Sequence, residues 1–351
     1  MALYSFKFIF IFSVFGMFTF NSCSNEAESD VQRFFVKERN DLSAADQLLF
    51  LDSALQENPQ NIDLLLQKGK LCKELLDFRC ALDAGAKAFL LDSTNLEARK
   101  LYAWTLINKP DAPLGDIDRA RRHYRYILSL EPNNLAIKIE LANTYALTGD
   151  FEASFKLIND VLRLNDRYRD AYVLKGSNYR VVGNYNLALS SYQTAVQIDP
   201  DFFMGHLQTA YLLTEMENHE LALEYYRNAA DIDPKSLEAL YGIAKSLQDL
   251  NRFDEAQQAY RNILQIDPDF FIAYFNQGFI KQYYTQELDS AVYYYNAAID
   301  VEPEYVKALH HLGETYFSLD RISDAARMYA KVLTLNPDYE PTLIAKEKLR
   351  R

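Results

Sequence analysis

Apolar side chains recur every three or four positions along most of this chain, which is the spacing of one face of a helix. Ala188, Tyr192 and Ala195, for example, stand at positions i, i+4 and i+7. Such stretches end near an acidic residue or an asparagine followed by proline, and a helix rarely continues through proline. The pattern predicts an all-α protein built of short amphipathic helices.

The helix-ending positions recur at a nearly constant interval. Ser93 and Asp166 occupy two of the steps, and prolines mark the others. These prolines are Pro59, Pro132, Pro200, Pro234, Pro268, Pro303 and Pro337. Successive intervals are 34, 39, 34, 34, 34, 34, 35 and 34 residues, so the chain is expected to be one array of a repeated unit rather than several separate domains.

Three positions of the repeat keep their character when the proline is counted as position 32. Position 8 is always small: Gly69, Ala103, Ala142, Gly176, Ala210, Ala244, Gly278 and Gly313. Position 20 is also small: Ala81, Ala120, Ser154, Ala188, Ala222, Ala256, Ala291 and Ala325. Position 24 is tyrosine in six repeats: Tyr124, Tyr192, Tyr226, Tyr260, Tyr295 and Tyr329. Small residues let two helices approach closely, and we expect the tyrosine ring to cover the space that they leave.

These features resemble the tetratricopeptide repeat (TPR), in which each unit of 34 residues is a pair of antiparallel helices. The resemblance covers residues 62–339 as eight repeats. It implies an all-α TPR solenoid, a right-handed superhelix of helical hairpins. The first repeat has Lys68 and Gly85 at core positions and is expected to be the loosest. The second carries five extra residues around 108–115, whose prolines and glycine suit a loop between its helices.

Both ends of the array are expected to carry shorter elements. Ser43 should cap a helix that ends at Pro59, so residues 43–61 are predicted to supply a partial repeat. Residues 340–351 are predicted to form a C-terminal capping helix with a polar outer face, which a solenoid needs at its ends.

The N-terminus has the pattern of an export signal. Residues 8–20 carry no charge, follow Lys7, and are too few for a membrane-spanning helix, which needs about twenty. The following Ser22-Cys23 resembles a lipobox of the loose type found in Bacteroidetes lipoproteins. Residues 1–22 are therefore predicted to be a lipoprotein signal peptide, and Cys23 the lipidated N-terminus. Ordinary cleavage nearby, which would leave a free thiol, is the alternative.

A short acidic segment follows the predicted lipid. Residues 23–42 are expected to form a solvated acidic tether and an N-terminal helix. The predicted localisation is the outer membrane, as a lipoprotein that faces either the periplasm or the cell surface.

Composition and motifs argue against nucleic-acid binding and catalysis. The chain has 49 acidic and 37 basic residues and a formal net charge of −12, whereas nucleic-acid binding needs a basic face. The motifs G-x-x-x-x-G-K-S/T, G-x-S-x-G and H-E-x-x-H are absent from the sequence, and no two histidines stand at i, i+4. His310-His311 is interpreted as a satisfied or surface pair. We therefore expect no enzymatic activity, no metal and no cofactor.

Cys72 and Cys80 lie near the helix–helix turn of the first repeat. In an oxidising compartment they could form a disulfide. The favoured interpretation is two separate small hydrophobic side chains, because position 19 of the repeat, where Cys80 stands, usually points outward.

The resemblance implies a protein–protein interaction scaffold or adaptor. In this family the first helix of each repeat lines a concave groove that receives peptide or protein segments, and its positions 2, 5, 9 and 12 face that groove. These positions give the candidate partner-binding residues: Asn143, Arg180, Tyr211, Tyr241, Lys245, Phe275, Phe279, His310, Glu314 and Phe317.

The expected ligand is an apolar or aromatic segment of an envelope protein. Phe275 and Phe279 would anchor it, and Lys245 and Glu314 would fix its direction. Packing of the two phenylalanines between adjacent helices is the alternative. A glycan-binding surface lipoprotein is the alternative function, although such proteins carry a large lobe outside the repeats for which this chain has no room.

Overall fold

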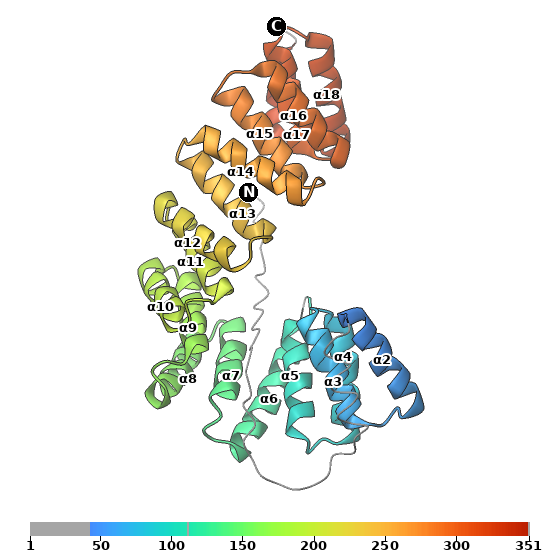
Figure 1. Cartoon of the computed structure of the whole chain (residues 1–351), viewed down its shortest axis with the longest axis vertical. Helices are drawn as coiled ribbons and strands as arrows, with labels where there is room; N and C mark the ends of the chain where they lie inside the picture. The colour runs from blue at the N-terminus through green and yellow to red at the C-terminus, as the bar shows by residue number, and fades with distance from the viewer. Residues whose placement is uncertain (1–42, 111, 350–351) are drawn as a thin grey trace. The chain divides into compact units, whose positions relative to one another are not determined.

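The computed structural model describes residues 43–110 and 112–349 of the chain (Figure 1). Within these ranges all regular structure is α-helical, as the sequence predicts. The predicted signal peptide, the tether and Cys23 lie outside the described residues. Contacts divide the chain into an N-terminal unit, which ends at Leu174, and a C-terminal unit, which begins at Lys175.

The N-terminal unit consists of one single helix followed by antiparallel helical hairpins. Its helices are α2 (Ala44–Glu57), α3 (Ile62–Glu74), α4 (Phe78–Leu91), α5 (Leu96–Asn108), α6 (Leu114–Leu130), α7 (Leu135–Leu147) and α8 (Phe151–Leu164). Helix α9 (Arg169–Val181) contains the boundary between the units. The hairpins are α3/α4, α5/α6 and α7/α8, and from α2 to α7 each helix also contacts the next one along the chain. Helix α5 ends at Asn108 and α6 begins at Leu114, so the second repeat has a longer connection between its helices, as predicted, although Leu114 and Gly115 belong to α6.

The C-terminal unit repeats the same arrangement. Its helices are α10 (Tyr185–Ile198), α11 (Phe203–Glu215), α12 (His219–Ile232), α13 (Leu237–Asp249), α14 (Phe253–Ile266), α15 (Phe271–Tyr283), α16 (Leu288–Val301), α17 (Val306–Ser318), α18 (Ile322–Leu335) and α19 (Glu340–Lys348). The hairpins α11/α12, α13/α14, α15/α16 and α17/α18 follow one another, and α19 packs against α18 and α17.

Small residues and tyrosines hold the two helices of each hairpin together. The six tyrosines of position 24 and the alanines of position 20 are all buried. A Cβ atom added to Gly278 would lie 2.8 Å from the Tyr295 ring, and one added to Gly313 would lie 2.5 Å from the Tyr329 ring. The tyrosine ring therefore occupies the space that a glycine at position 8 leaves, as predicted.

The turn between the two helices of most repeats contains one residue with a left-handed backbone. Gly149 and Gly183 have φ values of 80° and 78°, and five other repeats place a non-glycine residue there. These are Leu76, Glu217, Asn251, Gln286 and Asp320, with φ between 57° and 59°. Glycine adopts this conformation most readily, and Asn and Asp adopt it more readily than other residues. At Leu76, Glu217 and Gln286 the turn geometry is therefore held by the packing of the two helices rather than by the turn residue itself.

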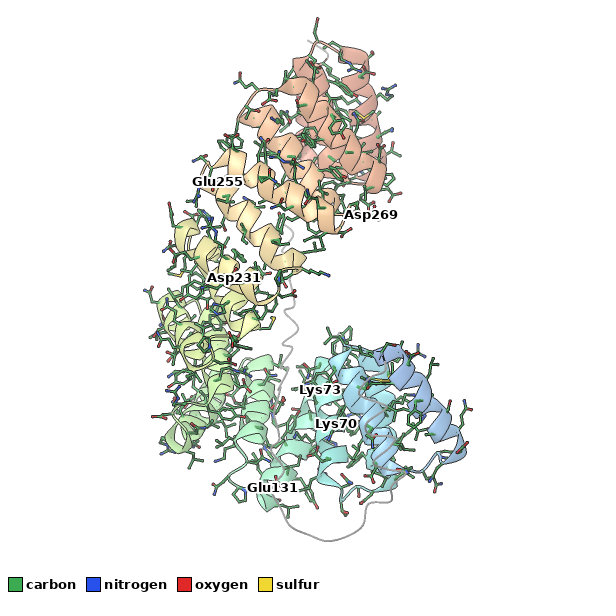
Figure 2. The ribbon with its side chains drawn as sticks, viewed as in Figure 1. Lys70, Lys73, Glu131, Asp231, Glu255 and Asp269 are labelled. Carbon is green, nitrogen blue, oxygen red and sulfur yellow. A yellow bond between two sulfur atoms is a disulfide. The ribbon has the colours of Figure 1, made fainter. Side chains whose placement is uncertain are left out.

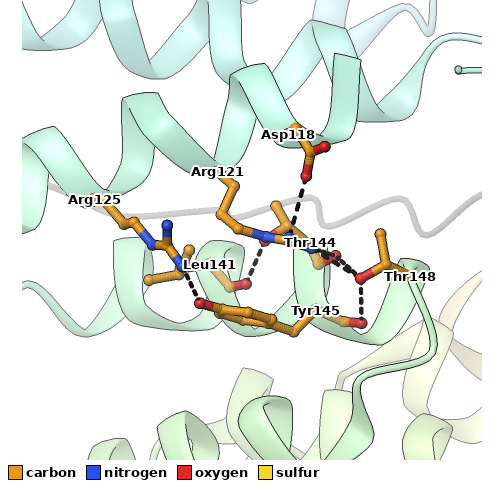
Figure 3. A network of polar contacts seen from close by, with 7 residues as sticks. All are labelled: Asp118, Arg121, Arg125, Leu141, Thr144, Tyr145 and Thr148. Carbon is orange, nitrogen blue, oxygen red and sulfur yellow. Dashed lines mark hydrogen bonds and ion pairs between the residues drawn. The ribbon is translucent and has the colours of Figure 1, made fainter. Parts of the chain in front are cut away.

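Arg121 of α6 fastens the second repeat to the third (Figure 3). Its guanidinium donates hydrogen bonds to the carbonyl oxygen of Thr144 at 2.8 Å and to the Thr148 hydroxyl at 2.8 Å, near the end of α7. It also lies 4.4 Å from the centroid of the Tyr145 ring. A cation at a helix C-terminus satisfies free carbonyl groups and interacts favourably with the helix dipole, so this contact stabilises the joint between the repeats.

Cys72 and Cys80 form a disulfide that joins α3 to α4. The interpretation of two separate hydrophobic side chains is therefore wrong. The tight turn at residues 75–77 brings the end of α3 beside the first turn of α4, with the two Cα atoms 5.7 Å apart, so the side chain of Cys80 faces Cys72 instead of solvent.

The two unusual core residues of the first repeat have structural roles. Lys68 forms an ion pair with Asp52 of α2. A Cβ atom added to Gly85 would lie 3.3 Å from the backbone nitrogen of Tyr102, so glycine allows α4 and α5 to approach closely. These contacts connect the first repeat to α2 and α5, and the disulfide joins its own two helices.

Candidate functional site

The predicted partner-binding residues all lie on first helices of repeats, but they differ in exposure. Asn143 lies in the N-terminal unit and is buried; the other nine lie in the C-terminal unit. Phe275 and His310 are buried as well, and Phe317 is 39% exposed. The remaining six are half-buried: Arg180, Tyr211, Tyr241, Lys245, Phe279 and Glu314.

Phe275 belongs to the hydrophobic core of the last two repeats. Its side chain is only 9% exposed, and its ring lies 5.3 Å from that of Tyr305, 5.6 Å from that of His311 and 5.8 Å from that of Tyr295. The expectation that this ring is exposed is therefore wrong, and the alternative, packing between adjacent helices, is what the structure shows. The physical reason is that Tyr305, which precedes α17, and His311 of α17 cover the Phe275 ring. This ring is therefore part of the core.

An exposed group of aromatic side chains lies next to Phe275. The ring of Phe279 lies 4.6 Å from that of Tyr283 and 6.1 Å from that of Tyr284, and Tyr284 stacks on Phe253 at 4.2 Å. Tyr283 is 43% exposed and Tyr284 is 47% exposed. We call Phe253, Phe279, Tyr283 and Tyr284 the aromatic edge.

Sequence reasoning found Phe279 but missed the rest of the aromatic edge. Tyr283 is the last residue of α15 and Tyr284 follows it, so both lie beyond the four positions that face the groove in this family. The sequence carries one indication of these tyrosines, the 35-residue interval of this repeat. Its extra residue lengthens the connection between α15 and α16 that follows them.

Several of the predicted polar residues are engaged with the neighbouring repeat. Arg180 of α9 donates from Nε to Glu215 of α11 at 2.8 Å, and this hydrogen bond raises the pKa of Arg180. Tyr211 of α11 donates to Glu238 of α13; burial, followed by this contact, raises the pKa of Tyr211. These contacts hold successive first helices in register, so a ligand would have to compete with them.

Lys245, in contrast, forms its ion pair within α13, with Asp249. We therefore expect a ligand to recruit Lys245 more easily than a residue that joins two repeats, because only a partly exposed i, i+4 ion pair has to break.

His310, His311 and Glu314 come together on α17, and we call these three residues the His–Glu cluster. Nε2 of His310 lies 3.6 Å from Oε1 of Glu314, and Nδ1 of His311 lies 3.1 Å from Oε2. One ligand atom from each residue falls within 4.8 Å of the others. Both histidines have hydrogen-bond partners, which agrees with the interpretation of a satisfied pair. That interpretation does not include the carboxylate at i+4 from His310 and i+3 from His311.

Two hydroxyl groups orient the His–Glu cluster. The Tyr283 hydroxyl donates to Oε2 of Glu314 at 2.6 Å and lies 3.0 Å from Nδ1 of His311. Nδ1 of His310 lies 2.8 Å from the hydroxyl oxygen of Thr342, which is buried on α19.

Charge and burial act in opposite directions on the cluster. Burial alone would raise the pKa of Glu314, but hydrogen bonds from His311 and Tyr283 and the charges of both histidines outweigh it and lower the pKa to about 2. Burial lowers the pKa of His310, and the charge of Glu314 opposes this shift only in part. The cluster is thus a carboxylate beside an imidazole that burial favours in its neutral form.

A second polar surface lies in the N-terminal unit, on α3 and α5. Nζ of Lys73 stands 4.4 Å from the centroid of the Trp104 ring, and Lys70 forms an ion pair with Glu97 at 3.1 Å (Figure 2). Burial lowers the pKa of Lys73, and Glu140 is the main charge that opposes this shift. Lys70, Lys73 and Trp104 occupy groove positions 9 and 12 of the first two repeats, which the set of predicted residues did not include.

Stacked helical hairpins with small residues at their crossings define the molecule as an α-solenoid. Sequence models of the tetratricopeptide repeat match residues 114–175 and 213–276, 173–236, and 306–339. Because these matches together cover more than half of the chain, it belongs to the tetratricopeptide-repeat family. Members of this family are protein-interaction scaffolds.

Solved structures overlap with parts of this chain. A crystal structure titled as the MamA protein is 20% identical and has a TM-score of 0.44, over 49% of this chain and 95% of the other. MamA of Desulfovibrio magneticus RS-1 is 18% identical with a TM-score of 0.45, over 50% and 98%. YrrB, titled a TPR protein with an unusual peptide-binding site, is 18% identical with a TM-score of 0.44, over 54% and 97%. No curated protein matches the sequence.

Within the described ranges, no helix is both long and apolar enough to cross a membrane.

Proposed function

We propose that this protein is a non-catalytic scaffold that binds an apolar or aromatic segment of a partner protein at the aromatic edge. The observation that carries the proposal is the exposure of Tyr283 and Tyr284 beside Phe279. Aromatic side chains cost little conformational entropy to immobilise, and clusters of exposed apolar groups usually mark interaction sites. In this proposal Phe279 is still an anchor for the partner segment, and Tyr283 and Tyr284 take the anchoring role that was expected of Phe275.

Two charged residues give the bound segment a direction in this proposal. Glu314 lies next to the aromatic edge, because the Tyr283 hydroxyl donates to it. Lys245 lies on α13, in the preceding repeat, and its ion pair with Asp249 is partly exposed. A segment with one basic and one acidic group flanking an apolar stretch would suit these two charges.

Partner capture tests the proposal with a double variant, Phe279→Ala with Tyr284→Ala. Truncation of one hot-spot aromatic typically costs 2 kcal/mol or more, so we expect the affinity of the double variant for the captured partner to fall by at least about thirtyfold. The matched control is Tyr293→Ala on α16, a tyrosine that is 67% exposed and lies outside the aromatic edge. Proteins captured from bacterial envelopes by each variant would be identified and their binding measured.

The test needs a check of folding, because Phe279 also packs against the core of the last repeats. A double variant with an unchanged unfolding transition and unchanged capture contradicts the assignment of the aromatic edge. Equal loss of capture by Tyr293→Ala contradicts it as well. Capture that depends on an added glycan would instead favour the glycan-binding function.

The scaffold is proposed to be a lipoprotein held in the bacterial outer membrane through Cys23, with envelope proteins as its partners. The uncharged segment 8–20 and the Ser22-Cys23 junction support this proposal. The disulfide between Cys72 and Cys80 supports it independently, because disulfides persist in oxidising compartments such as the periplasm.

Cys23→Ala is expected to move the protein from the membrane fraction to the soluble fraction. Acyl chains anchor a protein because each buried methylene contributes about 0.8 kcal/mol, and the variant would lack them. Ser24→Ala is the matched control and should stay in the membrane fraction. Fractionation of cells followed by detection of the protein decides the outcome, and retention of Cys23→Ala in the membrane to the same extent as the unmodified sequence would refute the lipid anchor.

A further inference from the structure

We propose that the His–Glu cluster is a binding site for a divalent transition-metal ion, with Zn²⁺ as the preferred candidate. The site would use Nε2 of His310, Nδ1 of His311 and one carboxylate oxygen of Glu314 as ligands. This inference does not depend on the proposed partner binding.

The separations of the ligand atoms fit one ion. Nitrogen and oxygen ligands lie about 2.0–2.2 Å from Zn²⁺, so neighbouring ligands of a tetrahedral site are roughly 3.3–3.5 Å apart. Nδ1 of His311 lies 3.1 Å from Oε2 of Glu314, Nε2 of His310 lies 3.6 Å from Oε1, and one ligand atom from each residue lies within 4.8 Å of the others. A separation of 4.8 Å must shorten by roughly 1.4 Å for tetrahedral geometry, which rotation of the side chains can supply.

The groups behind the ligands have the arrangement that metal sites use. A metal-binding histidine almost always donates its other ring N–H to a nearby oxygen, which fixes the ring and its tautomer. Nδ1 of His310 lies 2.8 Å from the Thr342 hydroxyl oxygen, and donation there leaves the lone pair of Nε2 directed toward Glu314. The Tyr283 hydroxyl in turn holds Oε2 of Glu314 at 2.6 Å.

The surroundings also favour a cation. Glu314 supplies a negative charge, and the rings of Phe275, Phe279, Tyr295 and Tyr339 lie within 6.0 Å of the two imidazoles, centroid to centroid. Such walls exclude water and strengthen the attraction between carboxylate and metal ion. Two imidazoles and one carboxylate suit Zn²⁺ rather than Mg²⁺ or Ca²⁺, which prefer oxygen ligands, and three protein ligands leave one position for water.

Zinc titration of the metal-free, untagged full chain tests the site. The reference protein carries Cys23→Ala so that no free thiol competes, because the two other cysteines are bonded to each other. Isothermal titration with ZnCl₂ should show one equivalent bound. Co²⁺ added in its place should give the visible absorption of a tetrahedral site.

Three variants locate the site. Glu314→Gln and His311→Gln keep the size of the side chain and are each expected to weaken zinc binding at least about tenfold, since even the groups behind metal ligands contribute that much. His219→Gln is the matched control, because His219 also faces a carboxylate, Asp249 at 3.9 Å, but has no second histidine there. Its zinc affinity should equal that of the reference protein.

Thermal unfolding of each variant without metal would show that the fold is kept. Absence of one-to-one binding in the reference protein overturns the proposal. So does unchanged affinity in both Glu314→Gln and His311→Gln, or an equal loss in His219→Gln, since each result would place the ion elsewhere.

Discussion

Replacement of Tyr295 by alanine should lower the free energy of unfolding of the C-terminal unit by about 3–5 kcal/mol, the usual cost of removing a buried aromatic side chain. Tyr295 of α16 is fully buried and covers Gly278 of α15, where no Cβ atom would fit beside its ring. Its hydroxyl also donates to Oε1 of Gln282 at 2.7 Å. Alanine would leave a cavity at the helix crossing and a buried acceptor without its donor.

Two further variants separate these contributions. Tyr295→Phe keeps the ring and removes only the hydroxyl, so it should cost about 1–3 kcal/mol, the penalty of leaving Gln282 unsatisfied. Tyr293→Ala changes an exposed tyrosine of the same helix and should stay within about 0.5 kcal/mol of the original protein. Denaturant unfolding would measure all three.

The damage should also be local, because each repeat of a solenoid contacts only its neighbours. Amide hydrogen exchange in Tyr295→Ala should rise first in α15, α16 and the adjacent α14 and α17. A cost below 1 kcal/mol, or exchange that rises equally in every helix of the C-terminal unit, would contradict this account of the repeat core.

The repeated features of the fold could be predicted from the sequence, because each of them recurs at the same position. Position 8 is small wherever position 24 carries a ring that must lie against it, as Gly278 and Tyr295 show. A steric requirement that recurs in every repeat selects the same type of residue at the same position, and this appears in the sequence as a periodic pattern. The helix boundaries follow from the same periodic pattern, because the prolines lie in the connections between hairpins.

Features that occur in only one repeat produce no periodic pattern in the sequence, so they could not be predicted in this way. Phe275 was expected to be exposed because its position faces the groove in the family, but Tyr305 and His311 of the next repeat close over it. The His–Glu cluster depends on Glu314 lying between two histidines and on Tyr283 from the neighbouring helix. Such contacts depend on which side chains meet across helices, which spacing along one helix does not determine.

The disulfide is a third case of this kind, and its contribution can be measured directly. Reduction of the bond between Cys72 and Cys80 should lower the free energy of unfolding of the N-terminal unit by about 2–3 kcal/mol, the chain-entropy value for a loop this short. The two cysteines are separated by 8 residues, and the bond holds the ends of α3 and α4 together.

The only tryptophan of the sequence reports on this repeat. Trp104 of α5 stacks on Phe78 with ring centroids 6.0 Å apart, and Phe78 lies in the loop that the disulfide closes. Lys73, next to Cys72, also lies over the indole ring. Tryptophan fluorescence during denaturant unfolding should therefore show the reduced protein unfolding at a lower denaturant concentration than the oxidised one.

Cys80→Ala in a Cys23→Ala background isolates the effect of the bond. Cys72 is fully buried, whereas Cys80 is half-buried, so this variant breaks the disulfide and leaves the buried sulfur in place. It should unfold like the reduced protein and should not respond to a reducing agent. An unfolding midpoint that is the same in the oxidised protein, the reduced protein and this variant would mean that the packing of α2 to α5 alone stabilises the first repeat.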